Sequence, residues 1–105
     1  MKIPIQRLLV LILFAFFLFA CNKDKNDPVI TIVGDNPLTH CVNFLYFDFG
    51  AVAYDEEDGD ITDKIVTTSS VAPSVVGTYT VKYSVEDNAG NRAEATRTVE
   101  VIQCK

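Results

Sequence analysis

The sequence predicts an all-β domain built from two packed sheets, and three observations support this fold class. Residues 77–102 (GTYTVKYSVEDNAGNRAEATRTVEVI) alternate between apolar and polar side chains on both sides of a turn, which predicts a β-hairpin. Short β-rich runs bounded by Gly, Pro, Asn and Asp precede it. No helical period is sustained after residue 21. Because such a hairpin has one apolar face, a second sheet must cover it, and the result is a sandwich.

Upstream of the hairpin, four β-rich runs are expected as further strands. They are residues 29–33 (VITIV), 39–42 (THCV), 50–54 (GAVAY) and 64–70 (KIVTTSS). Turn-forming residues separate these runs, notably GDNP at 34–37 and the acidic loop DEEDGD at 55–60. Residues 88–91 (NAGN) supply the hairpin turn, since Gly and Asn accept positive φ.

The first 20 residues are predicted to be a lipoprotein signal peptide and not part of the domain. Lys2 and Arg7 precede an unbroken apolar run at 8–20, which is too short to span a bilayer comfortably. The junction LFAC (18–21) resembles the lipobox of bacterial lipoproteins, in which the cysteine carries the lipid. We therefore expect Cys21 to anchor the chain to the outer membrane of the cell envelope, on its periplasmic or surface face, with residues 21–27 as a polar tether. The alternatives are an ordinary signal peptide with a chance cysteine, or a short membrane anchor.

The charge balance excludes some partners. The chain has 9 basic and 14 acidic residues, and loss of Lys2 and Arg7 with the leader leaves 7 basic residues and a net charge of −7. A domain this acidic repels phosphate backbones, so we expect no nucleic-acid binding.

Two cysteines remain for a structural role if Cys21 is lipidated. Cys41 and Cys104 are expected to form a disulfide in an exported, oxidising setting. The chain has one histidine, so a zinc site with these cysteines would be incomplete. The bridge would close a loop of about 64 residues, which the chain-entropy model converts to roughly 4 kcal/mol. The alternative is a pair of buried thiols.

The least expected stretch is FLYFDF at residues 44–49, in which five of six residues are apolar or aromatic. If this stretch is a strand with one face inward, some of its large side chains point outward. An exposed patch of this kind indicates a contact site. The alternative is that the side chains fold over one open end of the sandwich. The candidate contact surface consists of Phe44, Leu45, Phe47 and Phe49.

Arg97 has the parity of the buried face in the last predicted strand, where Ala93, Ala95, Val99 and Val101 also lie. A buried guanidinium without a partner is costly. We expect it to form a structural ion pair with a carboxylate of the acidic loop, Asp58 or Asp60.

The runs GAVAYDEEDGDIT (50–62) and VGTYTVKYSVEDNAGNRAEATRTVEV (76–101) resemble the bacterial immunoglobulin-like domains called DUF5011, also described as the Ig-like domain of a pesticidal crystal protein. They resemble the related HYR modules more loosely. The resemblance covers nearly all of residues 27–102 and implies an immunoglobulin-like Greek-key β-sandwich over residues 28–105. It also implies an accessory module on exported proteins, used as a spacer or for adhesion or carbohydrate association. The chain departs from the family pattern at Phe44, Leu45 and Phe49, where polar residues and Pro are usual.

The acidic loop also raises the question of a metal. Asp55, Asp58, Asp60 and, from the hairpin turn, Asp87 could bring several hard oxygens to one end of the sandwich, which suits Ca²⁺. The spacing does not match an EF-hand loop. The alternative is a solvated turn in which Asp side chains accept bonds from backbone amides. We otherwise expect no cofactor.

Catalysis finds little support in the residues, because His40 is the only histidine and no nucleophile motif or phosphate loop occurs. We therefore expect a non-catalytic, lipid-anchored module that contacts a protein or a glycan at the cell envelope. One alternative is a calcium-stabilised structural module. Another is a periplasmic inhibitor or chaperone-like subunit that binds through a sheet edge.

Overall fold

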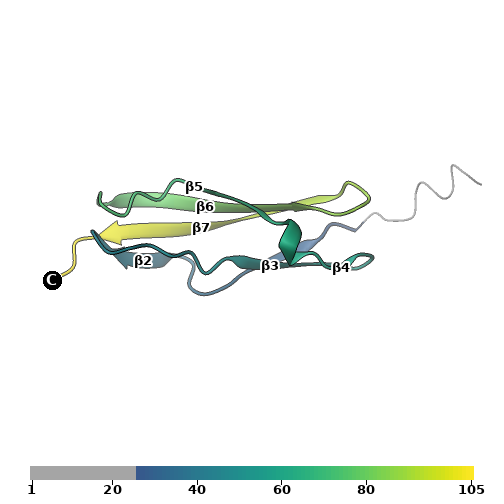
Figure 1. The fold of residues 1–105 in the computed structure, drawn as a ribbon, viewed down its shortest axis with the longest axis horizontal. Helices are drawn as coiled ribbons and strands as arrows, with labels where there is room; N and C mark the ends of the chain where they lie inside the picture. The colour runs from purple at the N-terminus through teal and green to yellow at the C-terminus, as the bar shows by residue number, and fades with distance from the viewer. Residues whose placement is uncertain (1–25) are drawn as a thin grey trace, which may run out of the picture.

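The computed structural model describes residues 26–105, which fold into two sheets lying face to face (Figure 1). The three-stranded antiparallel sheet has the order β1-β3-β4, and the four-stranded sheet has the order β2-β7-β6-β5. The strands are β1 (Val29–Ile32), β2 (Leu38–Cys41), β3 (Ala51–Asp55), β4 (Gly59–Asp60), β5 (Val66–Ser69), β6 (Gly77–Glu86) and β7 (Arg92–Ile102). This arrangement confirms the predicted all-β sandwich. The predictions for the signal peptide, for Cys21 and for most of the tether lie outside the described residues.

Each predicted run contains a strand, with small shifts at the ends. The run at 64–70 opens with a 3₁₀ turn, η1 (Thr62–Lys64), before β5 begins. β2 pairs with β7 in parallel and every other strand pair is antiparallel. The stretch at 44–49 is not a strand; it is an irregular connection from the four-stranded sheet to β3 in the three-stranded one.

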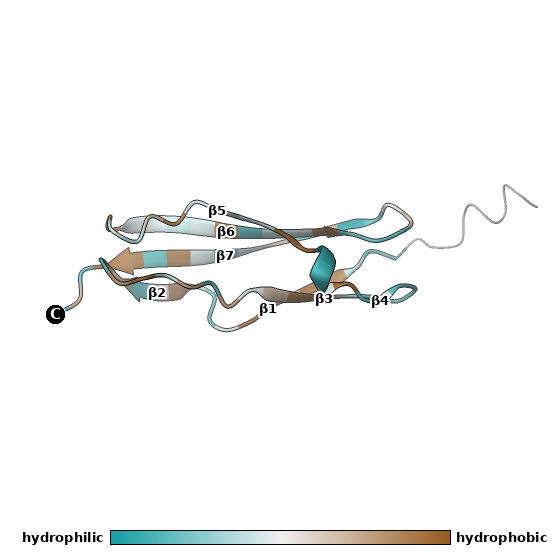
Figure 2. Ribbon diagram, in the orientation of Figure 1, coloured by the Kyte–Doolittle hydropathy of each residue, from teal (hydrophilic) through white to brown (hydrophobic). Residues whose placement is uncertain are grey.

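The β6–β7 hairpin supplies most of the core, with the predicted parity. Its inward side chains alternate with polar ones, and Figure 2 shows the resulting apolar and polar bands along β7. Full burial of one such aliphatic side chain contributes about 1.5–3 kcal/mol. The main buried cluster consists of Val42, Val81, Tyr83, Val99 and Val101, and a second cluster consists of Ala53, Ile61 and Val85.

A disulfide joins Cys41, at the end of β2, to Cys104, two residues after the end of β7, with 5.4 Å between their Cα atoms. This confirms the predicted pairing. The bridge fixes the last residues of the chain beside β2, at the end of the sandwich opposite to residue 26 (Figure 1). Within residues 26–105, no helix has the length and apolar character to cross a membrane.

Candidate functional site

The four residues of the predicted contact surface are all exposed. Phe44, Leu45, Phe47 and Phe49 keep 65–75% of their surface accessible, so they do not close over the end of the sandwich. Between them, Tyr46 and Asp48 are half-buried and turn toward the core. This alternation indicates that residues 45–49 are extended, although they are not part of a ladder. Asn43, at φ 72°, takes the left-handed backbone that Asn tolerates and starts this segment.

Gly50 reverses the alternation between this segment and β3. Upstream of it the odd-numbered side chains point outward, whereas in β3 the outward ones are Val52 and Tyr54. Gly50 has φ of 80°, which a residue with a side chain adopts only under strain. The reversal brings the aromatic segment onto the same outer face as the exposed residues of β3 and β1. We call this the apolar outer face; it comprises Val29, Val33, Leu45, Phe47, Phe49, Val52 and Tyr54.

Cross-strand pairing makes this face continuous. Val29 lies opposite Tyr54 in the β1–β3 ladder, and the next outward pair brings Thr31 opposite Val52. The ladder is extended by the bond from the Val33 amide to the Gly50 carbonyl, 3.0 Å long. Phe49 lies directly over Gly34, where an added Cβ would be 3.2 Å from the ring. The outer face of the three-stranded sheet is therefore unusually apolar for a surface that faces solvent.

A shallow hollow of about 440 Å³ adjoins this face beside Phe44 and Leu45. Its other wall is the β5–β6 connection, at Pro73 and Ser74, and the Asn43 amide bonds the Pro73 carbonyl at 2.8 Å. Residues 41–47 and 70–81 contain no charged side chain. Figure 1 shows this end of the molecule opposite to the point where residue 26 enters.

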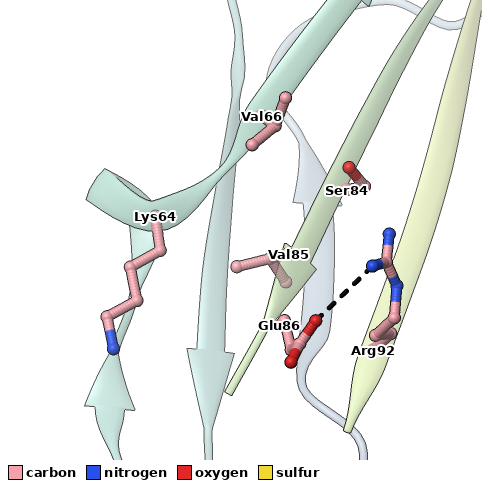
Figure 3. Close-up of a pocket in the computed structure, with 6 residues that line it drawn as sticks. All are labelled: Lys64, Val66, Ser84, Val85, Glu86 and Arg92. Atoms are coloured by element: carbon pink, nitrogen blue, oxygen red, sulfur yellow. Dashed lines mark hydrogen bonds and ion pairs between the residues drawn. The ribbon is translucent and has the colours of Figure 1, made fainter. Parts of the chain in front are cut away.

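A second hollow, of about 180 Å³, lies between η1 and the start of β7 (Figure 3). Lys64 and Arg92 flank it, but both cations are already engaged. Arg92 is paired with Glu86 at 3.4 Å, and the Lys64 amine donates to Asn88 Oδ1 at 2.9 Å. A hollow this small, with its charges satisfied, is not a convincing ligand pocket.

Arg97 is fully buried, as its parity predicted, but its carboxylate partner is Asp48. Its Nε donates to Asp48 Oδ1 at 3.2 Å and to the Tyr83 hydroxyl at the same distance. Its two Nη atoms donate to the backbone carbonyls of Asp35, Val33 and Gly50, at 2.5, 2.6 and 3.1 Å. One guanidinium thus ties the β1–β2 turn and the start of β3 to β7.

The prediction that Arg97 pairs with Asp58 or Asp60 is therefore wrong. Both carboxylates are bound elsewhere: Asp58 accepts from the Asn88 amide at 2.7 Å, and Asp60 accepts from the Thr62 amide at 2.9 Å. The register pairs Arg97 with Val81 in the middle of the hairpin, whereas the acidic loop lies near its turn. A signal for the true partner was present, since Asp48 is the only charged residue between positions 41 and 54.

Asp48 is the acceptor at the centre of a small network. Both tyrosine hydroxyls, of Tyr46 and Tyr83, donate to it, and so does the Gly50 amide. Burial raises the pKa of Asp48, but the hydrogen bonds from the tyrosines and from Gly50, with the charge of Arg97, outweigh it and hold the pKa below 3.8. Burial and the bond to Asp48 raise the pKa values of both tyrosines, which remain neutral donors.

The predicted calcium ligands do not all converge. Asp55 and Asp87 are 1% and 5% exposed, and Asp55 is close enough to influence the pKa of Asp87. Asp58 and Asp60 instead bond backbone amides, as the solvated-turn alternative predicts. Among residues 26–105, no three His, Cys, Asp or Glu side chains form a group that could hold a metal.

Backbone amides supply most of the donors to this carboxyl pair. Asp55 Oδ2 accepts from the amides of Glu57 and Asp58, and Asp87 Oδ1 accepts from those of Ala89 and Asn91. Burial raises the pKa of Asp87, but the hydrogen bonds that Asn91 and the Ala89 amide donate leave it lowered. Asp55 Oδ1 is buried and has no partner among the described residues.

His40 has no catalytic partner in the described part of the chain. Its Nε2 lies 2.9 Å from the Phe44 carbonyl oxygen, and its ring meets that of Tyr46 edge-on at 5.3 Å. These contacts support the aromatic segment and do not activate a nucleophile.

Comparison with known proteins decides the family. A model of the Ig-like domain of bacterial surface proteins matches residues 30–101. The chain belongs to this family. The fold is accordingly immunoglobulin-like, and the domain is of a kind found on bacterial surfaces; the finer assignments to DUF5011 and to the lipoproteins remain predictions.

Several individual proteins are similar over most of the chain. An uncharacterised 81.3 kDa protein of Acholeplasma phage L2 is 32% identical over 83 residues, which are 77% of this chain and 11% of that protein. A crystal structure of a lipoprotein from Bacteroides thetaiotaomicron has a TM-score of 0.64 at 23% identity, over 74% of this chain and 39% of that one, and shows the fold alone. A structure of CBM51-2 in complex with GlcNAc and INT domains from Clostridium perfringens ZmpB has a TM-score of 0.59 at 32% identity, over 74% of this chain and 17% of that one. This chain thus spans only a small part of each of these proteins.

Proposed function

We propose that this protein is a non-catalytic contact module of the bacterial cell envelope, which binds a protein or a glycan through its apolar outer face. The observation that carries the proposal is the exposure of that face, where Phe47 and Leu45 keep 74% and 75% of their surface accessible. A contiguous apolar patch that is exposed on a protein surface commonly marks an interaction site.

The surroundings of the face support a contact role. Aromatic side chains dominate the energetics of interfaces, and the three phenylalanines Phe44, Phe47 and Phe49 offer such anchors beside a hollow with polar groups at Asn43 and Ser74. A glycan partner is consistent with the similar segment within ZmpB, whose structure contains a CBM51 domain with GlcNAc. The contact of His40 Nε2 with the Phe44 carbonyl oxygen and the shallow form of the hollow beside Phe44 give no support to covalent chemistry.

Photocrosslinking in the cells that make the protein tests this role. A diazirine-bearing residue at position 47 should form an adduct, whereas one at Val66 on β5, which is 62% exposed, should not, because Val66 lies in the other sheet. Protease digestion of the adduct identifies a protein partner and periodate oxidation identifies a glycan. Equal adduct yields at both positions, or none at either, would contradict the proposal.

The lipid anchor is part of the proposal and rests on the sequence. Two or more acyl chains on Cys21 would give stable attachment, since each buried methylene contributes about 0.8 kcal/mol. Cells fed an alkyne-labelled fatty acid should label the wild-type protein but not Cys21→Ser. Label retained on Cys21→Ser would refute the anchor.

A calcium-stabilised structural module is the second candidate, and the unpartnered Asp55 Oδ1 favours it, because a cation beside Asp87 would satisfy that oxygen. In a thermal melt, 5 mM or so of Ca²⁺ should then raise Tm relative to a chelator, by several degrees for a domain of this size. An unchanged Tm eliminates this candidate and leaves the contact module untouched.

A further inference from the structure

Residues 45–49 form an extended segment with no neighbouring strand. No backbone N–H or C=O of these residues takes part in a backbone–backbone hydrogen bond within the described chain. The segment continues β3 toward the end of the molecule where the hollow lies, and the strands beside β3 do not follow it (Figure 1). β1 ends at Ile32, after which the chain crosses to the other sheet, and β4 pairs only with Tyr54 and Asp55.

The open segment is held in one conformation from its inner side. Tyr46 and Asp48 turn inward, and Asp48 is bonded to Tyr83 and Arg97, both of which are fully buried. At one end the Gly50 carbonyl accepts from Val33 and Arg97, and at the other the Asn43 amide donates to Pro73. A partner that pairs with this backbone would not have to order it first, which lowers the entropic cost of binding.

An unpaired, preorganised strand edge can pair with an extended peptide of another protein, which then adds to the sheet as a further strand. Main-chain hydrogen bonds give such a complex its affinity, and alternate side chains give it selectivity. We infer that residues 45–49 bind an extended segment of a partner protein, which adds to the three-stranded sheet as a strand beside the β3 extension. The inference rests on the proposed contact function and specifies its partner. A glycan does not present the regular alternation of N–H and C=O groups that such an edge matches.

The residues beside the open edge indicate which side chains the partner's added strand should carry. Side chains of the added strand on the outer face would lie beside Leu45, Phe47 and Phe49, so apolar residues at alternate positions fit best. No charged side chain occurs in residues 41–47, and the protein as a whole carries a net charge of −5, which disfavours an acidic segment. The expected partner is therefore an extended, alternating apolar peptide segment that is neutral or basic.

Amide hydrogen exchange on the full chain in lipid nanodiscs tests the inference. The probe is a capped octapeptide of alternating threonine and valine with a lysine at each end. At a free peptide concentration about nine times Kd, about one tenth of the protein remains unbound. Exchange of the amides in residues 45–49 that face the added strand should therefore slow by about tenfold. The same peptide N-methylated at every threonine and valine keeps its side chains but loses its interior backbone donors, and it should give no protection.

A matched pair of variants separates backbone pairing from side-chain contact. Phe47→Pro removes the N–H of residue 47 and should abolish protection of residues 45–49, because proline is excluded from paired strand interiors. Phe47→Thr keeps the N–H and removes the ring, so it should retain protection with a weaker Kd. If Phe47→Pro does not fold, the comparison between the plain and N-methylated peptides on the wild-type chain still decides.

Three results would overturn the inference. The first is that the amides of residues 45–49 are not protected at millimolar peptide, and the second is that the N-methylated peptide protects them equally. The third is protection that appears without peptide as protein concentration rises, which would identify a second copy as the occupant. These results are distinct from failure of the proposed function. An adduct from position 47 that is sensitive to periodate, together with an unprotected segment, would leave the contact role standing with a glycan partner.

Discussion

The carboxylates of Asp48 and Asp55 are held in different ways. Asp48 is held by the buried cation Arg97 and by two tyrosine hydroxyls, and its partners in β6 and β7 are 35 and 49 residues away in the sequence. Asp55 is held by backbone amides two and three residues further along; among the described residues, it has no ion pair and one of its oxygens is unpartnered. The first site links distant segments of the chain, whereas the second organises its own turn.

The difference separates two uses of the same side chain. A carboxylate paired with a buried guanidinium depends on that partner, because removal of either leaves an uncompensated buried charge. A carboxylate that accepts local amides makes bonds that a neutral amide side chain can largely reproduce. The four predictions below follow from this contrast, from the largest expected effect to the smallest.

Arg97→Ala should lower the free energy of unfolding by about 3–5 kcal/mol, because Asp48 then stays partly buried without its cation and three carbonyls lose a donor. Urea denaturation of the disulfide-intact domain measures the loss. Arg92→Ala is the control; its exposed pair with Glu86 is expected to contribute less than about 1 kcal/mol. Equal losses for the two variants would show that the contacts of Arg97 do not stabilise the fold more than an exposed ion pair does.

The same substitution should give unequal results at the two sites. Asp48→Asn should cost about 3 kcal/mol, since it leaves the buried guanidinium uncompensated. Asp55→Asn should change stability by less than about 1 kcal/mol, because its amide N–H₂ can donate to Asp87 while its oxygen still accepts from the turn. A greater loss at Asp55 than at Asp48 would reverse the assignment of roles.

Acid should destabilise the fold through both sites. The pKa values of Asp48 and Asp87 are lowered in the folded state, so their contribution is fully present above the unfolded value of 3.8 and is lost as pH falls through the folded values. Stability measured by urea titration should therefore decrease below about pH 4. Asp48→Asn should show a shallower decrease, since the contribution of Asp48 is removed; an unchanged slope would rule out Asp48 as a source.

Asp58→Ala should have the smallest effect, about 1 kcal/mol, because it removes the bond between the acidic loop and the Asn88 amide at an exposed position. Asp63→Ala is the control, since Asp63 is exposed and makes no described side-chain hydrogen bond. Thermal unfolding compares the two variants. If both melt at the same temperature, the loop does not depend on the contact between the two turns.

Alternation along the chain allowed much of this fold to be predicted. The parity of residues 92–102 identified the buried position of Arg97, because period-two patterning depends only on local sequence. The partner of Arg97 could not be predicted by the same rule, since Asp48 reaches it through the path of an irregular segment. Pairing of the acidic loop with Arg97 was inferred from charge alone, and charge does not specify register.

The extent of the apolar outer face was also beyond sequence reasoning. The sequence indicated that side chains within residues 45–49 would be exposed, but it predicted Val52 and Tyr54 only as part of a strand. The two halves share a face only because Gly50 takes a positive φ and reverses the alternation between them. A glycine between two apolar runs of opposite parity is the signal that could have joined them.

The placement of the two ends of the described chain has a mechanical consequence. Residue 26 enters at one end of the sandwich and the aromatic segment approaches the other, so a pull between the proposed membrane tether and the proposed partner would run along β1 and β3 (Figure 1). Their hydrogen bonds lie perpendicular to that load, and all four register pairs from Val29 to Ile32 would resist shear together instead of unzipping one by one.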